Sequence, residues 1–117
     1  LKVGFFETGV GWLPYWLERM AHFWKFGEMK LAIGYQGQRP PLEYLRSGNL
    51  YFNCEVDEQL VPQVVNLVGE DYLLYASDMP HGDRTPHNAR ILWERNDLSE
   101  QVKRKILSTN TLRFYGI

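Results

Sequence analysis

The stretch that decides the fold of this 117-residue chain runs from Tyr72 to Asp83 and reads YLLYASDMPHGD. A short apolar run leads to the carboxylate of Asp78, and Pro80 then turns the chain toward the imidazole of His81. A buried parallel strand followed by such a turn places a reactive acid at the edge of an α/β sheet. We therefore predict a strand over residues 72–76 and a site at its carboxyl end.

Two earlier apolar runs predict further strands of the same sheet. They cover residues 1–6 and 50–55, and we expect the first of them to be fully buried. Helical spacing and capping patterns predict helices over residues 12–26, 42–46, 57–68, 87–95, 97–107 and 110–115. Strands that alternate with helices indicate parallel pairing and an α/β fold.

Particular residues are expected to begin and end these helices. Asp57 and Asp97 are the expected N-caps, and Gly27 is the expected end of the first helix. Residues 28–39 show no period, and a loop of this length beside a sheet is often functional.

Composition limits the classes of partner. Formal net charge is -1, so we expect neither a nucleic acid nor a membrane as partner. The single cysteine, Cys54, excludes an intrachain disulfide framework and fits a cytoplasmic location. No apolar run reaches about 20 residues, and no secretory leader is evident. Because the chain opens at Leu1 inside an expected strand, we expect residues 1–117 to be a single partial domain.

Acidic residues follow all three predicted strands. They are Glu7, Glu55 and Asp78. In a parallel α/β sheet the carboxyl ends of strands carry the chemistry, and a carboxylate there binds a divalent metal or acts as a general base. The alternative is that each acid only caps the next helix or forms an ion pair. His81 lies three residues after Asp78, and we expect its imidazole to face the same cavity.

Other residues are candidates for substrate contact. Trp12 follows the first strand-end turn and is a candidate wall for a planar substrate, while Trp16 is expected in the core. Arg19 is a candidate for holding a substrate carboxylate, and Arg39 and Arg84 are alternatives in loops. The remaining histidines, His22 and His87, are expected on the surface or at a helix cap.

The motifs quoted above resemble the amidohydrolase superfamily. The matching stretches are residues 1–19, residues 69–83 with Ser77-Asp78-Met79-Pro80-His81, and residues 105–117 with Asn110 to Gly116. The resemblance is to the branch with amino-carboxymuconate-semialdehyde and resorcylate-type decarboxylases and related metal-dependent hydrolases. It implies a TIM (β/α)8 barrel, in which this chain supplies three βα units, strands six to eight. Three strands do not close a barrel.

The resemblance also assigns roles. Asp78 would bind the catalytic divalent metal of the full-length parent or serve as a base. Zinc is the expected metal, and manganese is the alternative. The isolated chain would bind either this metal or no metal. The family's other metal-binding histidines have no counterpart in residues 1–117. Related decarboxylases carry a histidine at the end of strand six, where this chain has Glu7. The reaction type is therefore left open.

These observations lead to one main prediction and two alternatives. We expect the C-terminal part of a metal-dependent enzyme that hydrolyses a C–N or C–O bond, or decarboxylates an aromatic or unsaturated acid. Its partners would be a small-molecule substrate and copies of itself, and the isolated chain would be inactive. One alternative is a non-catalytic module that self-associates through exposed strand edges. The other is a different α/β enzyme whose acids are only caps.

Overall fold

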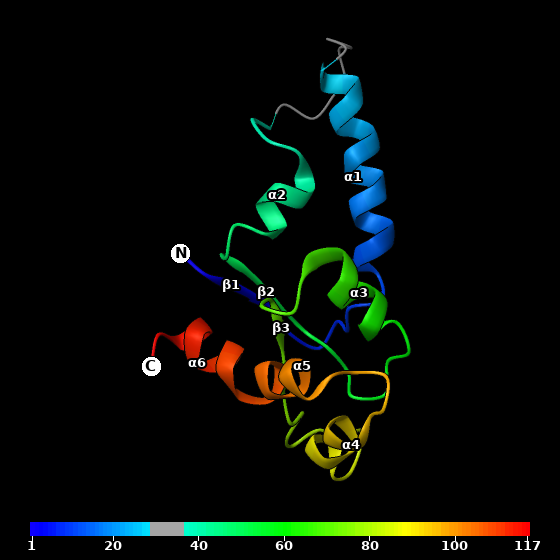
Figure 1. The fold of residues 1–117 in the computed structure, drawn as a ribbon, viewed down its shortest axis with the longest axis vertical. Coiled ribbons are helices and arrows are strands. Elements are labelled where there is room, and N and C mark those ends of the chain that lie inside the picture. The colour runs from blue at the N-terminus through cyan, green and yellow to red at the C-terminus, as the bar shows by residue number, and fades with distance from the viewer. Residues whose placement is uncertain (29–36) are drawn as a thin grey trace.

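A computed structural model describes residues 1–28 and 37–117, which form an α/β unit around a parallel sheet (Figure 1). The strands are β1 (Val3–Phe5), β2 (Leu50–Asn53) and β3 (Leu73–Leu74), in the order β1-β2-β3. Phe52 pairs with Phe5 on one side and with Leu73 on the other. The predicted α/β class and parallel pairing are confirmed. All three strands point their carboxyl ends toward the same edge of the sheet.

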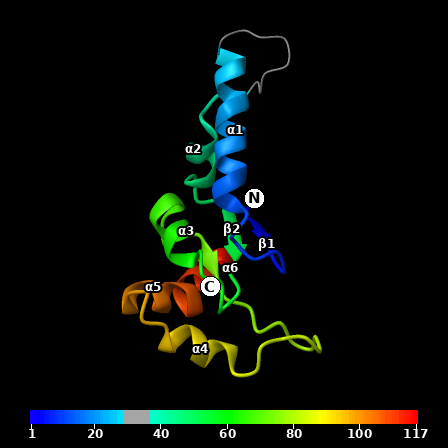
Figure 2. The ribbon, with the colours of Figure 1, turned by 90° about the vertical axis from the view of Figure 1, so that its right-hand side faces the viewer.

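Helices connect and follow these strands. They are α1 (Leu13–Glu28), α2 (Pro41–Leu45), α3 (Val61–Val68), α4 (Asn88–Glu94), α5 (Glu100–Arg104), the π-helical turn η1 (Lys105–Thr109) and α6 (Asn110–Tyr115). Figure 2 shows α1 and α2 side by side at one end of the molecule and α4 and α5 at the other. In the described part of the chain, no helix is both long and apolar enough to cross a bilayer.

The core lies between the sheet and the helices. α3 contributes Val61, Val64 and Val68, which recur at helical spacing and are at most 1% exposed. Phe52 and Leu73 face them from β2 and β3, and the buried side chains form one continuous cluster. Burial of these aliphatic and aromatic groups is the main force that holds the helices on the sheet.

Two expectations about burial are wrong. β1 is an edge strand, and Val3 and Phe5 remain 38% and 39% exposed, because no described element covers its outer side. Trp16 is 52% exposed rather than part of the core, since α1 turns Leu13 and Leu17 inward instead.

Three predicted helix boundaries are also wrong. α1 continues through Gly27 to Glu28. α3 begins at Val61, four residues after Asp57, with Pro62 in its first turn, where a missing N–H is tolerated. α5 is capped by the Ser99 hydroxyl, which accepts a hydrogen bond from the Val102 N–H at 3.2 Å. Asp97 binds Arg95 instead. Most of the predicted functional loop over residues 28–39 lies outside the described residues.

The C-terminal helices cover one edge of the sheet. The Tyr75 N–H donates to the Ile106 carbonyl of η1 at 3.1 Å, and the Asn110 side-chain amide donates to the Leu73 carbonyl at 2.8 Å. The backbone N–H and C=O groups of Leu73 and Tyr75 point away from β2, because the carbonyls of the alternate residues Tyr72 and Leu74 bind β2. The outer edge of β3 is therefore satisfied by the same chain. Within the described residues, the outer edge of β1 has no backbone partner.

Candidate functional site

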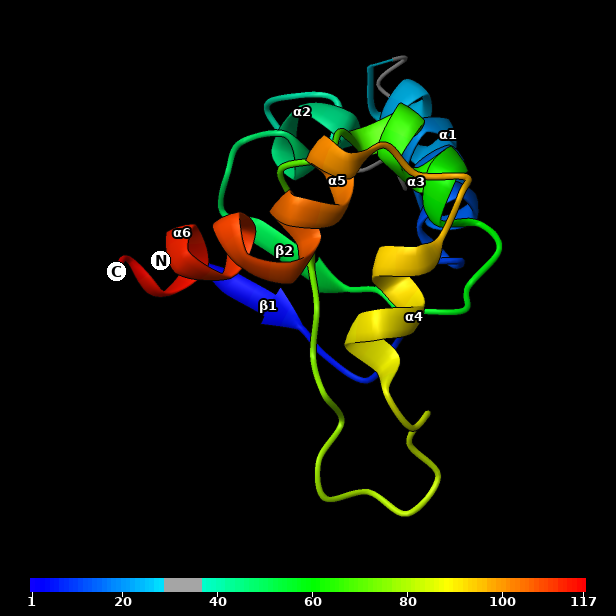
Figure 3. The ribbon, with the colours of Figure 1, turned by 60° about the horizontal axis from the view of Figure 1, so that its bottom comes forward.

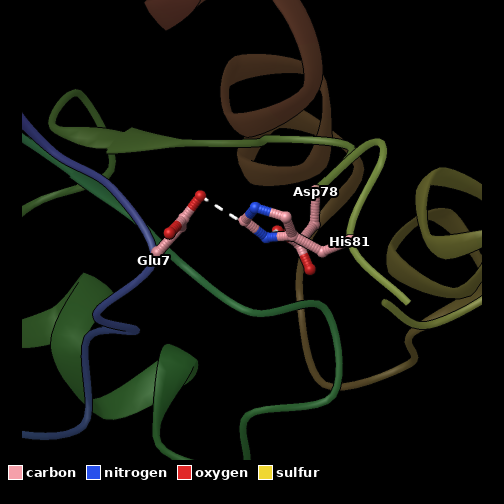
Figure 4. Close-up of side chains that lie close together, drawn as sticks. All are labelled: Glu7, Asp78 and His81. Atoms are coloured by element: carbon pink, nitrogen blue, oxygen red, sulfur yellow. Dashed lines mark hydrogen bonds and ion pairs between the residues drawn. The ribbon is translucent and has the colours of Figure 1, made fainter. Parts of the chain in front are cut away.

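Three ionisable side chains meet where the strands end. Glu7 follows β1, and Asp78 and His81 lie in the long loop after β3, which Figure 3 shows reaching away from the sheet. The His81 Nδ1 atom lies 2.7 Å from Asp78 Oδ1 and 3.6 Å from Glu7 Oε1. Figure 4 shows the three side chains pointing toward one another from two separate loops. The sequence prediction that Asp78 and His81 face one cavity agrees with this geometry.

The backbone at this site takes an uncommon conformation. Glu7 and Asp78 have φ values of 60° and 56°, in the left-handed region that residues other than glycine seldom adopt. Such conformations persist where surrounding contacts hold them, and they cluster at functional sites. Near Glu7 this contact comes from Asn53, which is 3% exposed and accepts a hydrogen bond from the Glu7 N–H at 3.3 Å.

Asn88 holds the segment that leads to Asp78. Its amide donates to the Ser77 carbonyl at 3.0 Å, and its carbonyl oxygen accepts from the Tyr75 hydroxyl at 2.5 Å. Asn88 is buried and begins α4, so it ties the β3 loop to that helix. The sequence analysis missed this role, because an asparagine beside a helix start is indistinguishable from a cap.

The site opens into a cavity of about 500 Å³. Its lining is dominated by acidic residues: Glu7, Glu55, Glu58, Asp78 and Asp83. Two basic side chains, His81 and Arg84, share the same wall. A volume of this size suits a small organic ligand.

The surroundings of the cavity raise two pKa values. The hydrogen bond that the His81 imidazole donates to Asp78, together with the negative charges of Asp78 and Glu7, raises the pKa of His81. Partial burial raises the pKa of Glu55, and the neighbouring carboxylates, led by Glu58 and Asp78, raise it further. The part of each shift that comes from neighbouring carboxylates has the same meaning: these negative charges favour an added positive charge in the cavity.

Glu58 is an acid of this cavity with a structural task. Its carboxylate accepts hydrogen bonds from the N–H groups of Val10, Gly11 and Glu55 at 2.8, 3.0 and 2.8 Å. It thereby joins the loop after β1 to the loop after β2. Gly9 is required there, since its φ is +57° and a Cβ atom would lie 2.5 Å from Glu58 Oε1. No pattern in the sequence singled out Glu58.

Glu7, Asp78 and His81 also form a candidate metal site. Each offers one ligand atom, and these atoms lie within 4.8 Å of one another. One imidazole nitrogen and two carboxylate oxygens suit zinc or manganese. Three protein ligands leave a position free for substrate or water, as in catalytic rather than structural sites. The trio fits a divalent ion.

Other candidates from the sequence lie apart from this trio. Trp12 donates from its indole to the Gly9 carbonyl at 3.0 Å and lines a separate apolar groove of about 320 Å³. Arg19 is exposed on α1, where its guanidinium stacks over Phe23. Contact of Trp12 or Arg19 with a substrate stays a prediction. Cys54 is buried, and burial raises the pKa of its thiol to about 12, which keeps it unreactive.

Comparisons with known proteins identify relatives of this fold. The sequence model of the family described as Amidohydrolase matches residues 7–117. An amidohydrolase from Mycobacterium avium subsp. paratuberculosis K-10 has a similar structure over 97% of this chain, with a TM-score of 0.78 and 24% sequence identity. This chain spans 28% of that protein's chain. The comparison with curated proteins gave no match. At this identity the structural likeness concerns the fold, part of an amidohydrolase barrel.

Proposed function

Since this chain belongs to the amidohydrolase family, we propose that it supplies βα units six to eight of a metal-dependent (β/α)8 enzyme. One observation carries the proposal: Glu7, Asp78 and His81 converge at the carboxyl ends of β1 and β3. In barrels of this class the active site lies at that end of the strands. Divalent metals are the general cofactors of amidohydrolases, and zinc is our first choice here, with manganese second.

The trio has two possible divisions of labour. In the first, Glu7, Asp78 and His81 all bind the ion. In the second, Asp78 binds the ion, and His81 carries a proton that it shares with Asp78 across 2.7 Å. A bound divalent ion supplies Lewis-acid chemistry, by polarising a carbonyl and making water more acidic. The hydrogen bond to Asp78 and its negative charge raise the pKa of His81, which favours the protonated imidazole that the second arrangement needs.

We propose hydrolysis of a C–N or C–O bond in a small molecule as the reaction, ahead of decarboxylation. Glu7 supports this order, because its carboxylate, together with that of Asp78, repels a substrate carboxylate placed between them to leave as CO2. Residues 1–117 alone are expected to show no turnover, because one part of a barrel does not complete the site.

Metal titration of the full-length protein tests this function. Asp78→Asn is expected to weaken zinc affinity by at least about 10-fold, since it removes a charged ligand. Asp97→Asn is the matched control, because this substitution removes the same charge from a residue that pairs with Arg95 and lies outside the cavity. Unchanged affinity in Asp78→Asn would sink the role of Asp78. His81→Ala then separates the two divisions of labour: lost zinc affinity supports the first, and retained affinity with lost turnover supports the second.

A second candidate function is self-association, which the open edge of β1 favours. Addition of a strand there would satisfy the unpaired backbone groups. The mass of residues 1–117 in size-exclusion chromatography with light scattering tests it. A monodisperse monomer would rule out pairing through this edge.

A further inference from the structure

Arg84 stands apart from the other arginines of this chain. Seven of the eight have a partner: Arg46, Arg90, Arg95 and Arg113 bind carboxylates or carbonyls, Arg104 pairs with Glu100, and Arg19 and Arg39 stack on aromatic rings. Among the described residues, the Arg84 guanidinium has no partner in a hydrogen bond, an ion pair or a ring contact. A guanidinium carries five donors, so this one is fully available to a ligand.

The position of Arg84 makes its availability informative. It is half-buried and lines the same 500 Å³ cavity as Asp78, His81 and Glu55. Several carboxylates line that wall, including its neighbour Asp83, yet none lies within 4 Å of its guanidinium in the described part of the chain. Burial raises the pKa of Tyr75, and the positive charge of Arg84 partly opposes this rise. Arg84 therefore adds a positive charge to the cavity wall, within electrostatic range of Tyr75.

We propose that Arg84 binds a carboxylate group of the substrate, so that the cavity takes an anionic small molecule. The proposal rests on the function proposed for the trio. The planar fork of a guanidinium matches a carboxylate with two parallel hydrogen bonds. The carboxylates that line the cavity repel an anion, so that Arg84 and the ion bound by the trio are the two points that attract one. The two cationic points orient the substrate, with its carboxylate on Arg84 and its reacting bond toward Asp78.

Binding of benzoate and of its neutral isostere benzamide tests this in the zinc-loaded full-length protein. The variants are Arg84→Met, which removes the charge and keeps much of the length, and Arg84→Lys, which keeps the charge without the fork. Arg90→Met is the control, because Arg90 is exposed on α4 and pairs with Glu94. The readout is the dissociation constant from NMR titration.

Wild type is expected to prefer benzoate to benzamide. Arg84→Met should lose about 10-fold to 100-fold in benzoate affinity, the size of one or two charge-assisted hydrogen bonds, while benzamide is unaffected. Arg84→Lys should fall between, and Arg90→Met should match wild type. Equal benzoate affinity in wild type and Arg84→Met, or no preference for benzoate in wild type, would overturn the proposal.

Zinc titration of the same samples separates this proposal from the function of the trio. Arg84→Met is expected to keep the zinc affinity of wild type. If it loses zinc affinity together with benzoate affinity, Arg84 shapes the metal site and the proposal is wrong. Zinc affinity that is insensitive to Asp78→Asn is a different result, and it bears on the proposed function instead.

Discussion

The two ends of β3 carry charged clusters of opposite character. Before the strand, Glu70 and Asp71 face Lys105 at 2.6 and 2.8 Å, and Arg113 adds a second cation 3.2 Å from Asp71. After the strand, Asp78 shares its cavity with four other acids and has His81 as its close basic neighbour. Both clusters contain acids on loops of the same sheet. They differ in whether the chain supplies the compensating charge.

The pKa values record this difference. The hydrogen bond from Lys105 holds the pKa of Asp71 below its usual value, while burial and neighbouring acids raise the pKa of Glu55. A compensated cluster stabilises the fold, whereas an uncompensated one stabilises whatever cation arrives. The same division separates the two faces of (β/α)8 barrels, where one carries stability and the other carries chemistry. Four substitutions test it, from the largest expected effect to the smallest.

Asn110→Ala should give the largest loss of stability. Asn110 is fully buried, and its amide donates to the carbonyls of Glu70 and Leu73, both at 2.8 Å. One buried and one partly buried carbonyl lose their donor, which costs about 2–4 kcal/mol. Denaturant unfolding measures this, with Asn96→Ala on the surface as control, expected within about 0.5 kcal/mol of wild type. Equal effects of both variants would contradict the structural role of this end.

Glu58→Ala should destabilise by about 2 kcal/mol, although Glu58 lies at the site end. Three backbone N–H groups lose the acceptor that joins the loops after β1 and β2. Glu18→Ala, on the exposed surface of α1, is the matched control. If Glu58→Ala does not change stability, Glu58 belongs with the uncompensated acids of the cavity and has no structural role.

Lys105→Met should cost about 1 kcal/mol at neutral pH, as expected for a partly exposed ion pair. Since the pKa of Asp71 is lowered from 3.8 in the folded state, its contribution is present above 3.8 and disappears as the pH falls through the lowered value. The difference between wild type and variant should therefore vanish in acid. Unfolding at pH 7 and near pH 2 measures it. A difference that persists at low pH would assign the loss to packing.

Glu7→Gln should have the smallest effect, within about 0.5 kcal/mol on stability. Glu7 contributes to the raised pKa of His81, after the hydrogen bond and charge of Asp78, and to the raised pKa of Glu55, after burial and the larger effects of three other acids. Both pKa values should fall toward their ordinary values. NMR titration of His81 and Glu55 in the metal-free protein measures this, and a clear loss of stability would show that Glu7 is an architectural acid.

Much of the fold could be predicted from the sequence, because apolar runs indicate buried strands and glycines indicate helix ends. The three strands and the end of α3 at Gly69 follow from such local signals. Two of the errors share a cause, which is that tertiary contacts compete with the local pattern. Asp97 binds Arg95 rather than capping a helix, and Trp16 faces outward because Leu13 and Leu17 occupy the inner face of α1.

The site was accessible only in part. Asp78 and His81 are three residues apart, so the turn between them could be inferred from Pro80 alone. Asn88 and Glu58 could not be found, because they act through hydrogen bonds to loops distant in sequence. The value of Arg84 lies in the absence of a partner among the described residues, and only the structure reveals this.

The cover that η1 and α6 place over β3 has a consequence for assembly. As long as Asn110 and Ile106 satisfy the outward backbone groups of Leu73 and Tyr75, the sheet of the described residues accepts a new strand at β1 alone, and a barrel that closes through β3 would have to open these contacts. A second copy therefore cannot add its β1 to the β3 of the first, which is the head-to-tail contact that would propagate into a fibre. Pairing of β1 with β1 obeys two-fold symmetry and stops at two chains. The C-terminal segment thus leaves the sheet open to a new strand on the β1 side, and this arrangement disfavours open-ended polymers.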